Sequence, residues 1–312
     1  MHIQAAVLRE RGGAFKIEDV ELAEPGPGEV LVEIAGTGFC HTDLLPRIDG
    51  FMAEPPLILG HEGAGMVAAT GTGVTDVAVG SSVVLSFDHC GTCPACSDGH
   101  PAYCRSFWGR NMVGRSAPLK PEHKTSRERR SVPVGSDSRR SPATVMAAAA
   151  AEAEYVIAVD RHRSRLDLAL ELGATHVVDS TGLPVGEIAN QVKGIAMGGT
   201  DTALDTTGAP SVVAAAVAAL CAQGTLGLVA AVAGPIELPG DALATGKTVT
   251  GILEGDAVPR ALIPELIDLW RQGRLPFDRL IRTYPMSDIN QAEADMASGH
   301  TIKAVLIPGA TT

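Results

Sequence analysis

The first hundred residues alternate short apolar runs with glycine and proline. The apolar runs share the length of a strand and cover residues 4–8, 29–35, 65–69 and 82–87. Short apolar runs between turn-forming residues are typical of β-strands. We therefore predict an irregular, mostly antiparallel β domain in this part of the chain.

The pattern changes at about residue 145, where helical and strand-like runs begin to alternate. The strand-like runs cover residues 155–159, 175–178, 202–204 and 225–229. Between them lie helical runs at 164–172, which ends at Gly173, and at 211–220. Such alternation predicts a parallel sheet with helices on its faces, so the fold class is α/β.

Length, hydropathy and charge argue against a membrane protein and a nucleic-acid-binding protein. A chain of 312 residues is long enough for two domains, and no apolar run approaches the roughly 20 residues that span a bilayer. The N-terminus lacks a charged segment followed by an apolar one, so we expect a cytoplasmic protein with no membrane partner. The net charge of −11 and the 4% aromatic content make a nucleic-acid partner unfavourable.

Four of the six cysteines fall within one short segment. They are spaced as Cys90-x2-Cys93-x2-Cys96-x7-Cys104, with glycine and proline between them. Four thiolates on a short irregular loop suit a tetrahedral structural zinc site. An iron–sulfur cluster and four unrelated free thiols remain as alternatives, because thiolate count alone does not distinguish them.

A second candidate metal site combines two motifs. They are Cys-His-Thr-Asp at residues 40–43 and Gly-His-Glu-Gly-Ala-Gly at residues 60–65. Cys40 and His61 can each donate to zinc, Thr42 can pass a proton from a bound alcohol, and Asp43 can orient His61. A lone histidine beside glycines is more often structural, so each motif is weak without the other.

Together the three motifs resemble those of the medium-chain, zinc-dependent alcohol dehydrogenases. Residues 38–114 are most similar to the aryl-alcohol (benzyl-alcohol) dehydrogenase branch, and the similarity resumes from about residue 145 to 308. The resemblance implies a GroES-like β-barrel catalytic domain, a Rossmann-like doubly wound parallel sheet, and a C-terminal segment that returns to the catalytic domain. It also implies NAD-linked oxidation of a small-molecule alcohol to an aldehyde, assisted by zinc, in a homo-oligomer.

The resemblance assigns roles to individual residues. Cys40 and His61 match ligands of a catalytic zinc, Glu62 matches the carboxylate beside that metal, and Thr42 matches the proton-relay hydroxyl. Asp160 matches the acid that holds the adenosine ribose of NAD and opposes the 2′-phosphate of NADP. Arg165 and Lys303 match cationic positions near the cofactor. Alternatively, Asp160 is an exposed acid at a strand end, and Arg165 lies on a solvated helix face.

The chain also departs from the family. The third catalytic-zinc ligand of the family is a later cysteine, but the only cysteine after Cys104 is Cys221, which we expect to be a small buried side chain. A Gly-x-Gly-x-x-Gly turn is missing before the strand that ends at Asp160, where residues 134–140 contain one glycine and two arginines. Glu152 stands at a helix end where glycine would be expected.

The segment between these halves is unusual in composition. Residues 115–141 contain eight Lys or Arg, six Ser and three Pro, and few large aliphatic residues. A solvated or disordered linker is one interpretation. We favour a second hypothesis, in which a frameshift and deletion have replaced family sequence; a divergent but intact family member is the third.

These features predict the following organisation. Residues 1–115 form the catalytic domain, 116–143 the aberrant segment, 144–272 a partial Rossmann domain without its first strand, and 273–312 the C-terminal return. The predicted function is an NAD-linked zinc alcohol dehydrogenase that acts on benzyl-type alcohols, with impaired activity. The alternative is a catalytically inactive, zinc-stabilised remnant. A zinc-knuckle nucleic-acid binder rests only on the basic segment and is opposed by the net acidity.

Overall fold

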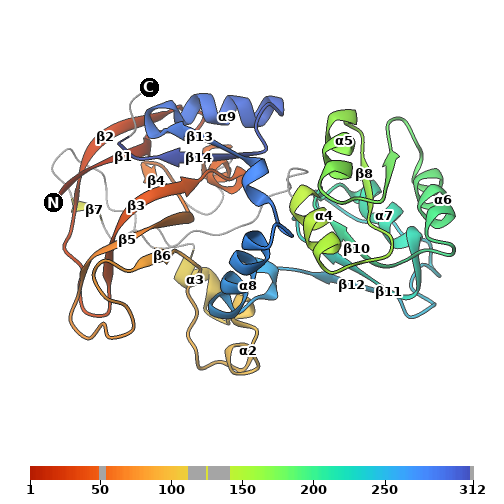
Figure 1. Cartoon of the computed structure of the whole chain (residues 1–312), viewed down its shortest axis with the longest axis horizontal. Helices are drawn as coiled ribbons and strands as arrows, with labels where there is room; N and C mark the ends of the chain where they lie inside the picture. The colour runs from red at the N-terminus through yellow and green to blue at the C-terminus, as the bar shows by residue number, and fades with distance from the viewer. Residues whose placement is uncertain (49–53, 112–123, 126–140, 310–312) are drawn as a thin grey trace. The chain divides into compact units, whose positions relative to one another are not determined.

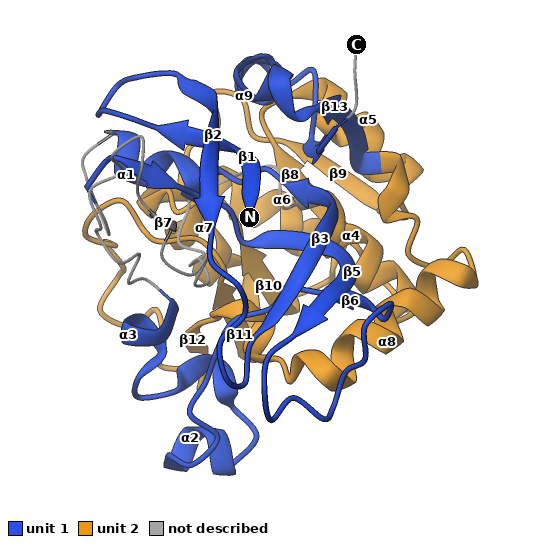
Figure 2. Ribbon diagram, turned by 90° about the vertical axis from the view of Figure 1, so that its left-hand side faces the viewer, with its two compact units in different colours: residues 1–133, 280–312 blue, residues 134–279 orange. Residues whose placement is uncertain are grey.

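The computed structural model describes residues 1–48, 54–111, 124–125 and 141–309. The aberrant segment predicted at 116–143 therefore lies almost entirely outside the described residues. The chain divides into two compact units, one formed by residues 1–133 and 280–312 and the other by residues 134–279 (Figure 2). The first is unit 1 and the second is unit 2.

Unit 1 consists mainly of β-strands (Figure 1). Its strands are β1 (His2–Leu8), β2 (Phe15–Leu22), β3 (Val30–Gly38), β4 (Leu57–Ile58), β5 (Glu62–Thr70), β6 (Ser82–Val84), β7 (Lys124–Thr125), β13 (Ile281–Pro285) and β14 (Lys303–Ile307). They form two sheets, ordered β4-β1-β2-β7 and β13-β14-β3-β5-β6. All pairs are antiparallel except β2 with β7 and β13 with β14. The predicted antiparallel β domain is confirmed.

Short helices connect these strands. They are the 3-10 helices η1 (His41–Leu44), η2 (Pro101–Tyr103) and η6 (Met286–Asp288) and the α-helices α1 (Leu45–Ile48), α2 (Pro94–Ser97), α3 (Phe107–Asn111) and α9 (Ile289–Ser298). One apolar cluster joins β1, β2, α9 and β14, with Leu8 fully buried and Leu306 nearly so. Burial of apolar surface from both chain ends stabilises this unit as one body.

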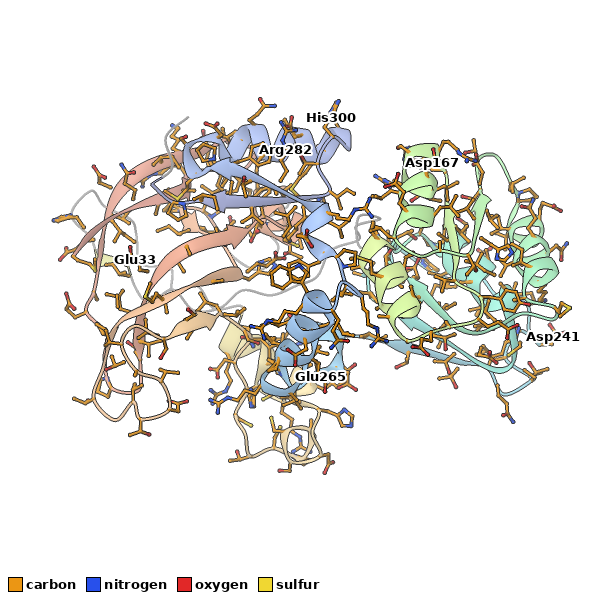
Figure 3. The ribbon with its side chains drawn as sticks, viewed as in Figure 1. Glu33, Asp167, Asp241, Glu265, Arg282 and His300 are labelled. Carbon is orange, nitrogen blue, oxygen red and sulfur yellow. The ribbon has the colours of Figure 1, made fainter. Side chains whose placement is uncertain are left out.

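Polar contacts also hold the C-terminal segment to the first strands. The amide of Phe15 donates to Asn290 Oδ1 at 3.0 Å, and Asn290 Nδ2 donates back to the carbonyl of Phe15 at 2.9 Å. The Tyr284 hydroxyl donates to Asp295 at 2.8 Å, and Arg282, labelled in Figure 3, lies 3.6 Å from the same carboxylate. These bonds fix β13 and α9, so β14 is held in register beside β3.

Unit 2 alternates helices with parallel strands. Its elements are α4 (Ser141–Ala150), β8 (Ile157–Asp160), α5 (Arg163–Glu171), β9 (His176–Asp179), α6 (Val185–Ile195), β10 (Thr200–Asp205), α7 (Pro210–Ala219), β11 (Leu220–Leu228), β12 (Thr248–Gly251), η4 (Glu254–Asp256), α8 (Pro259–Arg271) and η5 (Phe277–Leu280). Every strand pair in the described part of this unit is parallel. The predicted α/β alternation is confirmed.

The parallel strands of unit 2 fall into two sheets, ordered β8-β9 and β10-β11-β12. In the doubly wound order, the first strand lies between the second and the fourth. Here β8 and β9 correspond to the second and third strands, and β10 to the fourth. Within the described residues no strand lies between β8 and β10, and the residues just before α4 are not described. The loss of the first strand therefore stays a prediction from the sequence.

Backbone geometry agrees with the helix end predicted at Glu152. Glu152, two residues after the end of α4, has a φ of 58°, in the left-handed region that favours glycine. No helix among the described residues is long and apolar enough to cross a membrane.

Candidate active site and metal sites

The four-cysteine lobe brings its sulfur atoms close together. Each Sγ of Cys90, Cys93, Cys96 and Cys104 lies within 4.8 Å of the other three. The Sγ of Cys96 is 3.5 Å from that of Cys93 and 3.9 Å from that of Cys90. Zinc–sulfur bonds of about 2.3 Å in a tetrahedron place the sulfurs about 3.8 Å apart. The observed separations therefore fit a zinc ion held by four thiolates.

Backbone amides around the lobe favour thiolate over thiol. The amides of Thr92 and Cys93 point at the Cys90 sulfur at 3.5 and 3.3 Å, and they lower the pKa of Cys90 to about 5. The amide of Cys90 donates to the Cys104 sulfur at 3.3 Å. Such amide-to-sulfur bonds stabilise the negative charge that metal ligation requires. Proline at the start of α2 and the glycine at position 91, with φ of 73°, allow the chain to turn around the site.

The pairing of β3 with β5 brings the second pair of motifs together. Gly38, the last residue of β3, pairs with Glu62, the first residue of β5. Cys40 comes two residues after Gly38, and His61 comes one residue before Glu62, so this pairing brings the two motifs together. One ligand atom from each of Cys40, His61 and Glu62 lies within 4.8 Å of the others. This set offers a sulfur, a nitrogen and an oxygen, the three protein ligands that a catalytic zinc with one open position needs.

Asp43 orients His61, as the sequence predicts. Its Oδ1 lies 3.1 Å from His61 Nδ1, and its Oδ2 accepts from the amide of Cys40 at 3.0 Å, which also fixes the turn of η1. Because Nδ1 donates to the carboxylate, Nε2 is the nitrogen that can ligate a metal. Burial opposes a charge on His61, but Asp43 and Cys40 outweigh it and raise the pKa of His61 to about 10.

Cys40 and Thr42 both contact the same imidazole, Thr42 at Nε2. Burial raises the pKa of the Cys40 thiol, but the hydrogen bond with His61 and the charges of His61 and Lys303 outweigh it, so the pKa is lowered. The Thr42 hydroxyl, which is buried, lies 3.1 Å from His61 Nε2. The structure thus places Cys40, Thr42, Asp43, His61 and Glu62 in one cluster within unit 1.

Lys303 joins this cluster from β14. Its ammonium forms an ion pair with Glu62 Oε2 and lies 3.4 Å from the carbonyl of Phe39. Resemblance to the family implies that Lys303 lies near the cofactor, and that role stays a prediction. Its contact with Glu62 was missed, as was Gly38, whose missing side chain leaves room for the two side chains to meet. A glycine inside an apolar strand just before the Cys40 motif was the available signal.

The predicted cofactor residues of unit 2 lie at the carboxyl end of β8. Asp160 Oδ1 accepts from the amide of His162 at 2.8 Å, and its Oδ2 lies 3.6 Å from Arg165 Nη1. The Asp160 side chain is only 11% exposed, which does not fit the freely exposed acid of the alternative interpretation. Asp179 is its register partner on β9. Carboxyl ends of parallel strands are where doubly wound folds bind dinucleotides.

Two further residues of unit 2 differ from what was predicted from the sequence. Cys221 was expected to be buried, but it is partly exposed and its sulfur lies 3.4 Å from Asp201 Oδ1, so that expectation was wrong. It is the second residue of β11, and its side chain alternates with that of Leu220, which is buried in the core. Asp205, buried at the end of β10, was missed. It accepts from the Thr207 hydroxyl at 2.7 Å and the Gly208 amide at 2.8 Å, shaping the loop at this edge. The signal was an Asp-Thr-Thr-Gly turn after an apolar strand.

The chain matches known families and proteins over nearly its whole length. Residues 26–128 match the alcohol dehydrogenase GroES-like domain, and residues 142–272 match the zinc-binding dehydrogenase family. A geraniol dehydrogenase from Castellaniella defragrans is 35% identical, over 97% of each chain. That alignment runs over 365 positions, whereas this chain has 312 residues. At least 53 positions of the relative therefore have no counterpart here.

Solved structures agree. A zinc-binding-domain alcohol dehydrogenase protein from Burkholderia ambifaria is 36% identical with a TM-score of 0.87, covering 98% of this chain and 99% of that one. The benzyl alcohol dehydrogenase of Acinetobacter calcoaceticus is 33% identical with a TM-score of 0.84, covering 99% and 100%. The GroES-like and Rossmann-like fold class is confirmed, and zinc and NAD are the cofactors of this group. The chain belongs to the medium-chain, zinc-dependent alcohol dehydrogenase family.

Proposed function

We propose that this chain derives from an NAD-linked enzyme that oxidises benzyl-type alcohols to aldehydes, and that its own activity is impaired. The observation that carries the proposal is the cluster of Cys40, His61 and Glu62, with Thr42 beside the imidazole. These donors suit a catalytic zinc, and the four-cysteine lobe suits a structural one. Similarity to the benzyl alcohol dehydrogenase supports the aryl substrate, whereas the geraniol dehydrogenase relative supports a terpene alcohol.

Each residue of the cluster has a separate role in the proposed reaction. The chemistry that zinc supplies when bound is polarisation of the alcohol oxygen. Asp43 holds the imidazole of His61 so that Nε2 faces the ligand cluster. The Thr42 hydroxyl, buried on the Nε2 side of His61, is placed to relay the proton that the alcohol loses, accepting it as its own hydroxyl proton is passed on to water. Asp160 at the end of β8 would accept from the ribose hydroxyls of NAD.

Two features support impairment. The family's cysteine ligand has no counterpart in the described cluster, so Glu62 is left as the third donor. At least 53 positions of a relative also have no counterpart in this chain. Loss of the first strand and glycine turn would remove the seat of the cofactor pyrophosphate. The frameshift-and-deletion hypothesis for residues 116–143 accounts for both features.

The impaired activity leaves a second candidate function. A catalytically inactive, zinc-stabilised protein is favoured by the glycine turn that the sequence lacks before the strand ending at Asp160. The domain boundaries, a homo-oligomeric state and a cytoplasmic location remain predictions from the sequence.

A repaired chain tests the enzymatic lineage. Residues 115–144 are replaced by the longer corresponding sequence of the benzyl alcohol dehydrogenase relative, and NADH formation is followed with benzyl alcohol and with geraniol. We expect the repaired chain to oxidise benzyl alcohol with the higher kcat/KM and to lose the activity on Cys40→Ser. A repaired, folded chain that prefers geraniol would contradict the aryl assignment. One that oxidises neither alcohol would contradict the lineage.

A further inference from the structure

The carboxylate of Glu62 is shared between two partners. Its Oε1 lies 3.8 Å from His61 Nε2, while its Oε2 forms the ion pair with Lys303. The Glu62 side chain is 32% exposed and that of Lys303 is 31% exposed, so neither charge is deeply buried. The Glu62 carboxylate therefore lies between the His61 imidazole, a candidate metal ligand, and the Lys303 ammonium, which can compete with a metal for it.

Gly38 provides the space in which the two side chains meet. It lies opposite Glu62 on β5 and opposite Val305 on β14, so three neighbouring strands converge there. A Cβ at position 38 would lie 2.0 Å from Glu62 Oε2 and 3.0 Å from Lys303 Cε. Any side chain at position 38 would displace the ion pair. The strand pairing, rather than flexible surface groups, thus sets the position of Lys303.

Charge determines what this contact does to a metal. Zinc binds a carboxylate oxygen because the carboxylate is negative, and a nearby ammonium both neutralises that charge and repels the divalent ion. With only Cys40 and His61 beside it in the described cluster, Glu62 is the donor on which a three-ligand site depends.

We propose that Lys303 is a positioning residue that holds Glu62 away from full metal ligation, and so sets the affinity of the Cys40, His61 and Glu62 site. This inference rests on the proposed function, because it requires a metal at that cluster. The Lys303 ammonium and a divalent cation compete for one carboxylate. Removing the ammonium should therefore strengthen metal binding rather than weaken it.

Cobalt titration of the purified full-length chain tests the competition. Zinc is kept in the four-cysteine lobe, Co²⁺ is added, and the thiolate-to-cobalt absorption that depends on Cys40 is measured, with Cys40→Ala as the blank. Lys303→Met should lower the Co²⁺ dissociation constant about tenfold, in the range of effects that groups bonded to a metal ligand have on affinity. Lys303→Arg, which keeps the ion pair, should leave it unchanged, and Lys303→Gln gives a second uncharged variant if Lys303→Met folds poorly.

The double variants separate the possible outcomes. In a Glu62→Gln background, Lys303→Met should raise Co²⁺ affinity much less than in the unaltered chain, because the contested carboxylate is gone and only the direct repulsion between the ammonium and the metal is relieved. Unchanged or weaker binding in the uncharged Lys303 variants, or an equal gain with Glu62→Gln, would overturn this inference alone. Absence of any Cys40-dependent signal in every variant would overturn the metal site and with it the proposed function.

Discussion

Replacing Cys93 by serine should release zinc from the four-cysteine lobe. The Sγ of Cys93 lies 3.5 Å from that of Cys96, and the four sulfur atoms of the lobe lie within 4.8 Å of one another. Structural zinc sites in peptides bind with about 10–16 kcal/mol, so one of four thiolates accounts for about 3 kcal/mol. A loss of that size weakens zinc affinity about a hundredfold.

The same change should loosen the lobe because little else holds it. Ala102 and Phe107 are its buried apolar side chains, and Asn111 ties its end to Asp88 through bonds of 2.7 and 2.9 Å. With so small a core, metal binding and local folding are coupled. Faster amide hydrogen exchange is therefore expected in residues 89–104, and little change is expected in unit 2.

Chelator competition with a zinc-sensitive dye measures the affinity directly. Cys221→Ser is the matched control, because Cys221 lies outside the cluster and contacts Asp201 instead. The control should keep the zinc affinity of the unaltered chain. Wild-type zinc affinity in Cys93→Ser, an equal loss in Cys221→Ser, or iron and sulfide in place of zinc would refute the reasoning.

Three other changes follow from the described contacts. Asp43→Asn should weaken Co²⁺ binding at the second site about tenfold, because His61 loses the carboxylate that orients it, and unchanged affinity by titration would contradict that role. In the repaired chain, Asp160→Ala should reduce the preference for NAD over NADP in calorimetry, and a preserved preference would exclude Asp160 as its source. Gly65→Ala should lower stability by about 3 kcal/mol, because its Cβ would lie 2.0 Å from the carbonyl oxygen of Glu33, and an unchanged melting temperature would contradict this register of β3 and β5.

Local sequence was sufficient to predict several elements of the fold, but not β12, β13, β14, α6, α8 or α9. The strands β1, β3, β5 and β8 to β11 follow apolar runs between turn residues, and α5 and α7 follow helical periodicity. By contrast β2 was missed, because its apolar residues at 15, 17, 20 and 22 break the alternation of a strand. Pairing with β1 along its whole length overrides that irregularity.

The candidate site was predictable where its residues are close in sequence. Asp43 lies three residues after Cys40, and the turn between them fixes both side chains relative to His61 on the neighbouring strand. Lys303 could not be placed at Glu62 in this way, because the contact depends on β14 pairing with β3 from far along the chain. The role of Gly38 could not be predicted for the same reason, since only the pairing of the three strands shows that the Glu62 and Lys303 side chains lie beside it.

The rate of NADH formation by the 312-residue chain tests the central claim most directly. Positioning of cofactor and substrate can supply roughly 7–11 kcal/mol of barrier reduction, much of which needs a seated pyrophosphate. With benzyl alcohol and NAD the unaltered chain should therefore react at or near background, while the chain repaired between residues 114 and 145 recovers activity. A robust rate from the unaltered chain that disappears on Cys40→Ser would contradict the account and show that the site is complete as it stands.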